Sequence, residues 1–297
     1  MRGKWFKHIA LHLELYTVMS AAGELVLRFS GLYEKGRKNA ADLRIVSKNL
    51  YFDRLPENFD GYTIMLLGDL HIDGQSWLCD TIVELIQNIC VDTCLFLGDY
   101  RAKVKGPFAK VVRDLDRVVS NVHIRDQLLA IRGNHDTANM FADLRAMGLR
   151  LLLNEAVEIR RKSQSLWLAG IDDPHYFEQD DIAKATAGIP RDGFKILLAH
   201  SPEAFKEASN YGYDLYLCGH THGGQIVLKN FGPLVVNAPK CRSRASGTWN
   251  YNGMLGYTSL GVGTSALPVR FNCPPEIVVM TLRRNHTQRE QRSTRWL

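Results

Sequence analysis

The sequence predicts an α/β fold in which a largely parallel sheet is covered by helices, with antiparallel strands added toward the C-terminal end. Two observations carry this prediction. Apolar runs of strand length alternate with helical stretches, which is typical of parallel sheets that carry helices on their faces. From residue 225 onward, short apolar runs are instead separated by Gly, Pro and Asn, as in antiparallel strands.

The expected elements follow one another along the chain. A strand-like run at 44–52 leads into the first buried strand. Buried strands are expected at YTIMLLG (62–68), TCLFLG (93–98), QLLAI (127–131), SLWLAGI (165–171), FKILLA (194–199) and YDLYLC (213–218). Helices are expected at about 76–90, 107–121, 137–148 and 178–187. Antiparallel strands are expected at 225–228, 233–236, 254–260 and 275–282.

The amino-acid composition limits the class of protein and the kinds of partner that we expect. The 297 residues are 45% hydrophobic and 23% charged, as in ordinary globular proteins, and they suffice for a large core. The net charge of +6 favours anionic partners such as nucleic acid, acidic lipid or phosphorylated small molecules. None of the six cysteines forms a CxxC pair, and Cys94 and Cys218 lie in apolar runs. Buried free thiols indicate a reducing compartment, so we expect a cytoplasmic protein.

The N-terminal segment combines apolar and charged residues at helical spacing. Charged side chains such as Glu14, Glu24 and Arg28 interrupt the apolar residues, so no membrane-spanning helix is predicted. The apolar residues recur in steps of three and four, at Leu11, Leu15, Val18, Ala22, Leu25, Phe29 and Leu32. This spacing predicts an amphipathic helix. It either packs on protein or lies in an anionic membrane surface, and both alternatives stay open.

Polar side chains that can bind metals follow five of the predicted buried strands. They are Asp69 and His71, then Asp99, then Asn134, His135 and Asp136, then His200, and finally His220 and His222. The carboxyl ends of parallel strands form the ligand crevice of such sheets, so we expect these residues to converge. Residues two apart in an extended chain project to the same side, so Asp69 with His71, and His220 with His222, can face one pocket.

The chemistry of these side chains indicates divalent metal ions. Imidazole, carboxylate and amide oxygen suit Mn, Fe, Zn or Co, and the absence of thiolates argues against a structural zinc site. Seven ligands are too many for one tetrahedral ion but fit two ions that share a bridging carboxylate. Two-metal centres of this kind promote in-line displacement at phosphorus.

The ordered motifs GD-x-H, GD, GNHD, AHSP and GHTHGGQ resemble those of the calcineurin-like metallophosphoesterases, and in particular the bacterial branch whose last motif continues as GGQ. The resemblance covers about residues 59 to 283. It implies a four-layer α-β-β-α sandwich of two mixed sheets flanked by helices. The expected organisation is therefore an N-terminal extension over 1–58, a catalytic domain over 59–283 and a basic flexible tail over 284–297.

The resemblance also implies roles for the site residues. Asp69, His71 and His222 would hold one metal ion, Asn134, His200 and His220 the second, and Asp99 would bridge them. Manganese is the ion we expect, with Zn, Fe or Co as alternatives.

Further residues are expected to act beside the metals. On the resemblance, His135 would stabilise or protonate the leaving oxygen, with Asp136 orienting its ring, although Asp136 is equally well interpreted as a turn-forming residue. Arg101, two residues after Asp99, is expected to contact the substrate phosphate. His175 is a candidate substrate contact, although a plain loop residue is the better interpretation.

These features predict a two-metal hydrolase of phosphodiester or pyrophosphate bonds. The specific expectation is cleavage of UDP-2,3-diacylglucosamine to UMP and a lipid monophosphate by a cytoplasmic enzyme attached peripherally to the inner membrane. The alternatives are a broad-specificity phosphodiesterase, and a nuclease or nucleotide phosphodiesterase, although no nucleic-acid-binding module is present and nucleic acid is not expected as a partner. A non-catalytic scaffold would lack some of the ligands, and here all seven are present.

Overall fold

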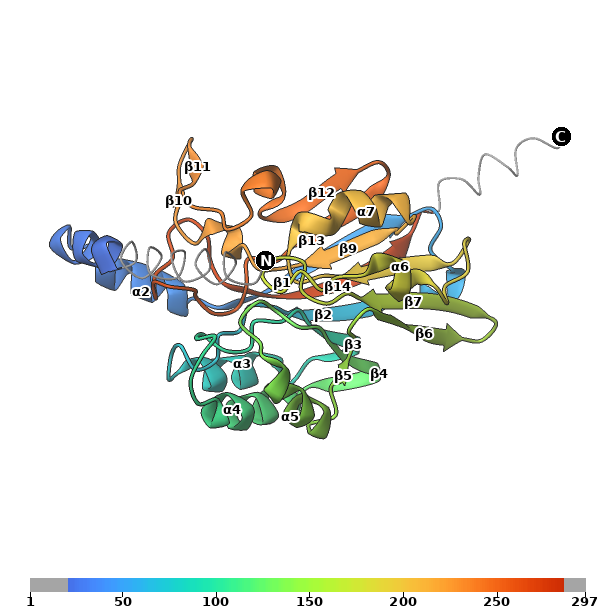
Figure 1. The fold of residues 1–297 in the computed structure, drawn as a ribbon, viewed down its shortest axis with the longest axis horizontal. Coiled ribbons are helices and arrows are strands. Elements are labelled where there is room, and N and C mark those ends of the chain that lie inside the picture. The colour runs from blue at the N-terminus through green and yellow to red at the C-terminus, as the bar shows by residue number, and fades with distance from the viewer. Residues whose placement is uncertain (1–20, 286–297) are drawn as a thin grey trace, which may run out of the picture.

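The computed structural model describes residues 21–285, and its main body is a sandwich of two six-stranded sheets (Figure 1). In the first sheet the strand order is β1-β14-β2-β3-β4-β5. Its strands are β1 (Arg44–Phe52), β14 (Glu276–Arg284), β2 (Thr63–Leu67), β3 (Cys90–Phe96), β4 (His123–Ala130) and β5 (Arg150–Leu151). Strands β2 to β5 run parallel, whereas β14 is antiparallel to β2, so the sheet is mixed.

The second sheet has the order β12-β13-β9-β8-β7-β6. Its strands are β12 (Gly247–Tyr251), β13 (Met254–Thr258), β9 (Leu215–Cys218), β8 (Phe194–Leu198), β7 (Gln164–Gly170) and β6 (Glu155–Arg161). The central strands β7, β8, β9 and β13 are parallel, and antiparallel strands form both edges. A small separate hairpin consists of β10 (Val227–Leu228) and β11 (Gly232–Pro233).

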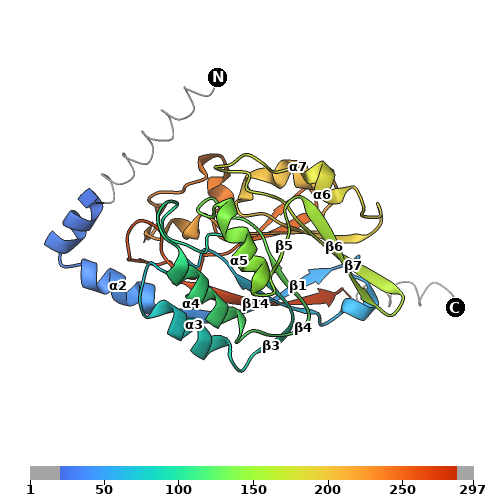
Figure 2. The same cartoon turned by 60° about the horizontal axis from the view of Figure 1, so that its bottom comes forward.

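Helices cover the outer face of each sheet, which confirms the predicted four-layer fold. The helices α3 (Leu78–Ile86), α4 (Ala109–Val119) and α5 (Phe141–Ala146) lie against the first sheet, as Figure 2 shows. The second sheet carries α6 (Ile182–Thr186) and α7 (Phe205–Asn210). Short 3-10 helices occur at Glu57–Phe59, Ala138–Met140, Pro202–Ala204, His222–Gly224 and Pro239–Arg244.

The continuous apolar runs of the central strands follow from burial on both faces. In β2, Ile64 and Leu66 face the core between the two sheets, whereas Met65 and Leu67 pack against the helices. Side chains alternate along a strand, so a strand covered on both sides must be apolar at every position. Cys94 and Cys218 are buried free thiols in such strands, as their apolar surroundings predicted.

Five helices and strands were not predicted from the sequence, among them the two-residue strand β5 and the six-residue helix α7. Strands β6 and β12 are sheet edges whose polar side chains hide the strand pattern, and α2 (Tyr33–Ala41) lies in a segment whose basic residues obscure its helical character. Strand β1 pairs in parallel with β14, so this lead-in segment forms the edge of the first sheet.

The two ends of the chain are described only in part. Most of the predicted amphipathic helix, up to residue 20, and most of the predicted basic tail, from residue 286, lie outside the described residues. Residues 21–29 are helical, and Leu25, Phe29 and Leu32 are exposed. No helix within residues 21–285 is both long and apolar enough to cross a membrane.

Candidate metal centre

The predicted ligands come together at the carboxyl ends of five strands, drawn from both sheets. Asp69 and His71 follow β2, Asp99 follows β3, Asn134 follows β4, His200 follows β8, and His220 and His222 follow β9. Backbone hydrogen bonds join these loops directly: the Asp69 amide donates to the Gly98 carbonyl at 3.1 Å, and the Gly219 amide donates to the His200 carbonyl at 2.9 Å. Each ligand loop is therefore held by the loop of a neighbouring strand.

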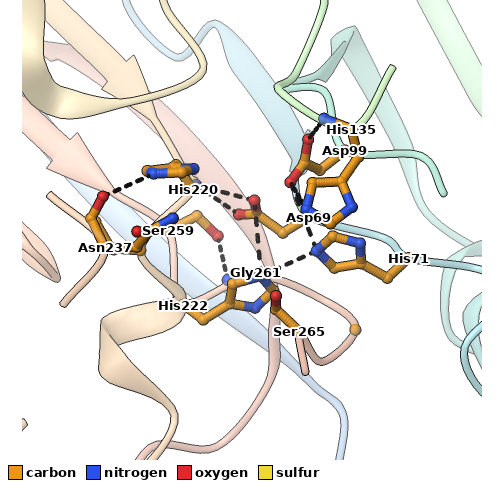
Figure 3. Close-up of polar contacts among 12 residues, drawn as sticks. Asp69, His71, Asp99, His135, His220, His222, Asn237, Ser259, Gly261 and Ser265 are labelled. Carbon is orange, nitrogen blue, oxygen red and sulfur yellow. Dashed lines mark hydrogen bonds and ion pairs between the residues drawn. The ribbon is translucent and has the colours of Figure 1, made fainter. Parts of the chain in front are cut away.

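One group of potential ligand atoms consists of Asp69, His71 and His222, whose donor atoms all lie within 4.8 Å of one another. His71 Nε2 is 3.1 Å from His222 Nε2, and Asp69 Oδ1 is 3.9 Å from His222 Nε2 (Figure 3). All three side chains are buried. The spacing suits one ion that draws on an oxygen and two nitrogens.

A second group contains Asp99, His200 and His220, again within 4.8 Å. The amide oxygen of Asn134 completes it, because Asn134 Oδ1 lies 2.8 Å from His200 Nε2 and 2.8 Å from His220 Nδ1. His220 and His222 thus belong to different groups although one residue separates them.

The Asp99 carboxylate lies between the two groups. Its Oδ2 is 3.6 Å from His71 Nε2, and its Oδ1 is 3.4 Å from His200 Nε2. Each carboxylate oxygen therefore faces one group, which is the arrangement that a bridging ligand requires.

Backbone carbonyls set the orientation of three histidine rings. His71 Nδ1 donates to the Arg101 carbonyl at 2.8 Å, His200 Nδ1 to the Leu97 carbonyl at 2.8 Å, and His220 Nε2 to the Asn237 carbonyl at 3.0 Å. Because a carbonyl only accepts, the neutral ring carries its proton on that nitrogen and turns a lone pair toward the centre. Support of this kind is typical of metal-binding histidines.

The oxygen and nitrogen atoms of the two groups are therefore suited to binding cations. In the second group, the inward nitrogens of His200 and His220, when unprotonated, face an amide oxygen that also only accepts hydrogen bonds. Acceptors so close together repel one another unless protons or cations lie between them. No thiolate belongs to either group, so the oxygen and nitrogen donors favour borderline divalent ions.

Burial and mutual charge control protonation in the metal-free centre. Burial raises the pKa of Asp69 to about 7 and lowers the pKa of His71 to about 4. Burial also lowers the pKa of both His220 and His222 well below the usual value. Burial, the largest single effect, disfavours the His200 imidazolium, but the charge and hydrogen bond of Asp99 together with the charges of Asp69 and Asp173 outweigh burial and raise the pKa of His200 well above its ordinary value. The metal-free protein thus keeps protons on Asp69 and His200 that an incoming cation must displace.

Five of the seven predicted ligands have left-handed backbone conformations. Their φ angles are 51° for Asp69, 41° for His71, 55° for Asp99, 71° for His220 and 50° for His222. Such conformations are uncommon for residues other than glycine and cost energy unless the surroundings enforce them. Their concentration at one edge of the sandwich indicates that the backbone is constrained here to aim side chains inward.

Gly98 illustrates this constraint and offers a test. Its φ is +85°, and a Cβ at this position would lie 2.4 Å from the backbone nitrogen of Gly133. Gly98→Ala is expected to lower the free energy of unfolding by about 3 kcal/mol, from the left-handed conformation and the backbone clash together. Urea denaturation measures this effect.

A matched control separates the two causes. Gly148 has a φ of +89°, and a Cβ added there would meet no atom within 4 Å, so Gly148→Ala carries only the conformational cost, about 1 kcal/mol. Equal losses in the two variants would contradict the proposed close approach of the Asp99 and Asn134 loops.

His135 lies beside the two groups. Its ring centroid is 4.9 Å from that of His71, and its Nε2 is 3.9 Å from Asp99 Oδ2. Its Nδ1 donates to the Ala102 carbonyl at 2.8 Å, which leaves Nε2 free to meet a ligand. The side chain is 18% exposed, whereas the side chains of His71 and His200 are fully buried. His135 is thus accessible from the solvent side of the centre.

The contacts of Asp136 differ from those expected. Its carboxylate accepts the backbone N–H groups of Asp99 at 2.7 Å, Tyr100 at 3.0 Å and Gly133 at 2.9 Å. The imidazole of His135 is held by a carbonyl instead. Of the two interpretations of Asp136, the contacts match the turn-forming residue and not the orientation of the His135 ring: the carboxylate accepts amides of two turns and fixes the backbone of the Asp99 loop.

The prediction for Arg101 also requires correction. Its side chain is buried, and its Nη2 donates to the Gly106 carbonyl at 2.9 Å within its own loop. Only 2% of the residue is exposed, and its buried Nε has no hydrogen-bond partner, so the guanidinium does not lie on an open surface where a substrate phosphate would meet it. The backbone carbonyl of Arg101 serves the site instead, because it accepts the His71 Nδ1 proton.

Sequence reasoning missed Arg270, which lies directly behind His222. Its side chain is fully buried, with Nη2 3.3 Å from His222 Nδ1 and 2.8 Å from the Leu260 carbonyl that accepts its proton. Nothing in the run PVRFN marks this residue. His175 lies over the second group, with its ring centroid 4.1 Å from that of His220 and its Nδ1 2.6 Å from Glu203 Oε2.

A four-layer α/β sandwich with clustered aspartate and histidine side chains at its strand ends is the arrangement of a metal-dependent hydrolase, a class that includes phosphatases and nucleases. Residues 63–248, more than half of the chain, match the family described as the calcineurin-like phosphoesterase superfamily domain. The chain belongs to this superfamily and is a metal-dependent phosphoesterase.

Several curated proteins are similar to the chain. The uncharacterized metallophosphoesterase YkuE of Bacillus subtilis is 28% identical over 253 residues, which cover 77% of this chain and 82% of that protein. Phosphodiesterase YaeI of Escherichia coli is 28% identical over 240 residues, covering 76% of this chain and 84% of that protein. The transmembrane protein with metallophosphoesterase domain of Danio rerio is 29% identical over 269 residues, covering 84% of this chain and 59% of that protein.

Proposed function

We propose that the centre holds two divalent ions and hydrolyses phosphodiester or pyrophosphate bonds. Asp69, His71 and His222 would hold one ion, Asn134, His200 and His220 the other, and Asp99 would bridge them. The single observation that carries the proposal is the position of the Asp99 carboxylate, whose two oxygens face the two groups at 3.6 and 3.4 Å. Manganese is the preferred ion, and Zn, Fe or Co suit the same donors.

When bound, the ions would supply Lewis-acid activation of the phosphoryl oxygens and a nucleophilic water. The chain's own contribution is to fix the ligands and to leave one histidine unligated. The free Nε2 of His135 lies on the exposed side of the centre, where a leaving oxygen would emerge. We infer that His135 donates a hydrogen bond or a proton to that oxygen.

His135→Asn is therefore expected to lower kcat by about 100-fold or more while the bound metal content stays unchanged, because general acid catalysis is worth 10²–10⁴-fold. The loss should be larger for a methyl phosphodiester than for bis-p-nitrophenyl phosphate, whose leaving group needs no proton. Steady-state kinetics together with metal analysis of the purified protein give both quantities.

The control is His123→Asn, which makes the same change at an exposed position at the start of β4. It should leave kcat and metal content unaltered. Loss of metal in His135→Asn would mean that this histidine is a ligand, and equal loss with both substrates would contradict proton donation.

For the substrate, we propose UDP-2,3-diacylglucosamine, cleaved at its pyrophosphate to UMP and a lipid monophosphate, in keeping with the bacterial GHTHGGQ branch. Exposed apolar residues near the N-terminus and the net charge of +6 support a cytoplasmic enzyme that takes a lipid-linked substrate from an anionic inner-membrane surface. A relative from Danio rerio named as a transmembrane protein supports action near membranes. The relative named phosphodiesterase YaeI favours the alternative of a broader phosphodiesterase.

The general proposal is tested with chelator-stripped protein and bis-p-nitrophenyl phosphate. Activity should be absent without metal and should return with Mn²⁺. No activity with any of Mn²⁺, Zn²⁺, Fe²⁺ or Co²⁺ would refute it. The substrate proposal is tested separately by release of UMP from UDP-2,3-diacylglucosamine: a metal-loaded enzyme that cleaves bis-p-nitrophenyl phosphate but releases no UMP would leave only the broader phosphodiesterase.

A further inference from the structure

The β10–β11 hairpin carries a group of exposed apolar side chains. Leu228, Phe231, Leu234 and Val235 are 43%, 84%, 53% and 59% exposed, although they lie within eight consecutive residues. The two strands have only two residues each, so the hairpin is too small to bury these side chains against itself. Exposed apolar side chains clustered in this way indicate a surface that contacts a membrane or another molecule.

A second group of the same kind lies on residues 21–32. Leu25, Val26, Phe29 and Leu32 are 56%, 66%, 85% and 43% exposed. Together the two groups contain eight of the ten large hydrophobic side chains that are exposed within the described part of the chain. The exposed apolar surface is therefore concentrated rather than scattered.

One connecting segment, residues 263–272, joins the two groups in space. On the hairpin side, the Val227 amide donates to the Phe271 carbonyl at 2.9 Å, and Gln225 Nε2 donates to the Leu267 carbonyl at 3.1 Å. On the other side, a Cβ at Gly23 would lie 3.3 Å from Leu267 Cδ1. Figure 1 shows the hairpin and the N-terminal helices at the same end of the molecule.

The hairpin is also continuous with the metal centre. It begins directly after the motif that contains His220 and His222. The Asn237 carbonyl, just beyond the hairpin, accepts the His220 Nε2 proton at 3.0 Å. A surface that receives the hairpin would therefore lie beside the predicted metal ligands.

The charged residues in and around the hairpin indicate the kind of surface that the hairpin contacts. Residues 215–275 contain no Asp or Glu, whereas they contain Lys229, Lys240, Arg242, Arg244 and the buried Arg270. Lys229 lies in the hairpin turn, two residues before Phe231. In residues 215–275 exposed apolar side chains are combined with cations and no carboxylates, whereas in the second apolar group Glu24 is paired with Arg28. The hairpin therefore matches an anionic lipid surface, in which apolar groups enter the acyl boundary while cations meet the headgroups.

We propose that the β10–β11 hairpin inserts Phe231 and its apolar neighbours into the surface of an anionic bilayer. The enzyme would then present its metal centre to phosphoesters carried by membrane lipids. This consequence for the substrate rests on the proposed phosphoesterase function, whereas the membrane contact itself does not.

The test is flotation of the full-length protein with vesicles of phosphatidylcholine alone or mixed with equal parts of phosphatidylglycerol. The protein should bind the anionic vesicles and not the neutral ones. The double variant Phe231→Ser/Leu234→Ser should reduce the partition coefficient about tenfold or more, because each side chain loses its apolar burial. Lys229→Glu should weaken binding to the anionic vesicles further.

Two control variants make the result specific. Tyr51→Ser removes a side chain that is 60% exposed on β1, at the end of the first sheet away from the metal centre, and should bind like the unmodified protein. Phe29→Ser tests the second apolar group independently. If the hairpin variant binds like the unmodified protein, or if the unmodified protein binds no vesicles, the proposal is wrong.

Activity and oligomeric state distinguish the remaining outcomes. Hydrolysis of dissolved bis-p-nitrophenyl phosphate should be equal in the unmodified protein and the hairpin variant. Vesicle binding by a protein that is inactive with every metal ion would refute the phosphoesterase proposal and leave the membrane contact standing. A dimer in solution that the double variant dissociates would overturn the proposal in favour of a second copy of the chain.

Discussion

Asp99→Asn is expected to abolish phosphodiester hydrolysis, with kcat/KM falling by far more than about 100-fold. Loss of even an outer partner of a metal ligand commonly costs 10–100-fold, and Asp99 faces both groups of donors. The asparagine side chain keeps the shape but removes the negative charge that would hold two cations together. Metal analysis should show less than two ions per chain, and kinetics with bis-p-nitrophenyl phosphate should show the loss of rate.

The control is Asp92→Asn, the same change at a buried carboxylate of β3 away from the centre. Asp92 accepts the Thr63 amide at 2.7 Å and pairs with Arg161 at 2.8 Å, so its loss should lower stability. Metal content and kcat should remain those of the unmodified enzyme. Unchanged hydrolysis in Asp99→Asn would disprove the two-metal proposal.

Metal affinity is expected to fall steeply as the pH decreases from about 8 to about 6. In the metal-free protein the Asp69 carboxyl has a pKa of about 7, raised by burial, and the Asp99 charge raises the pKa of His200 well above its ordinary value despite burial. Both groups must lose protons before they bind a cation. His71, whose pKa burial lowers to about 4, is already neutral over this range.

The raised pKa of Asp69 also determines how the stability of the metal-free protein changes with pH. The folded-state pKa of Asp69 is raised, so its contribution to the stability of the metal-free protein is fully present below the unfolded value of 3.8 and is lost as the pH rises through about 7. Metal binding replaces that proton and removes the penalty. The rise in Tm on adding Mn²⁺ should therefore be larger at about pH 8 than at about pH 6.

Calorimetric titrations in buffers of different ionisation enthalpy measure the protons released. Below about pH 7 the apparent affinity should fall by one to two powers of ten per pH unit, as one or two protons are released per ion. A rise in Tm that is independent of pH would show that Asp69 and His200 do not lose protons to the metal. Asp92→Asn again serves as the control, because its effect on stability should not change the proton count.

Much of the fold follows from the sequence because it depends on local patterns. A strand buried on both faces must be apolar throughout, so β2, β3 and β9 are visible as continuous runs. Edge strands are covered on one face or less, so β6 and β12 mix polar and apolar residues and escape recognition. Their identity as strands depends on the partners β7 and β13, which no local pattern contains.

The sequence by itself determined the chemistry of the centre, since the types and order of the seven predicted ligands are local motifs at strand ends. The resemblance to the metallophosphoesterases already implied their division into two groups, whereas only the tertiary structure decided how each side chain is supported. His220 and His222 both have left-handed backbones and face different groups, whereas the extended-chain argument placed the two side chains in one pocket. The Asp136 carboxylate accepts backbone amides rather than the His135 ring, and Arg101 Nη2 donates to a backbone carbonyl of its own loop, because most buried polar groups are paired with whichever groups the fold brings near. Arg270 reaches His222 across 48 residues of chain for the same reason.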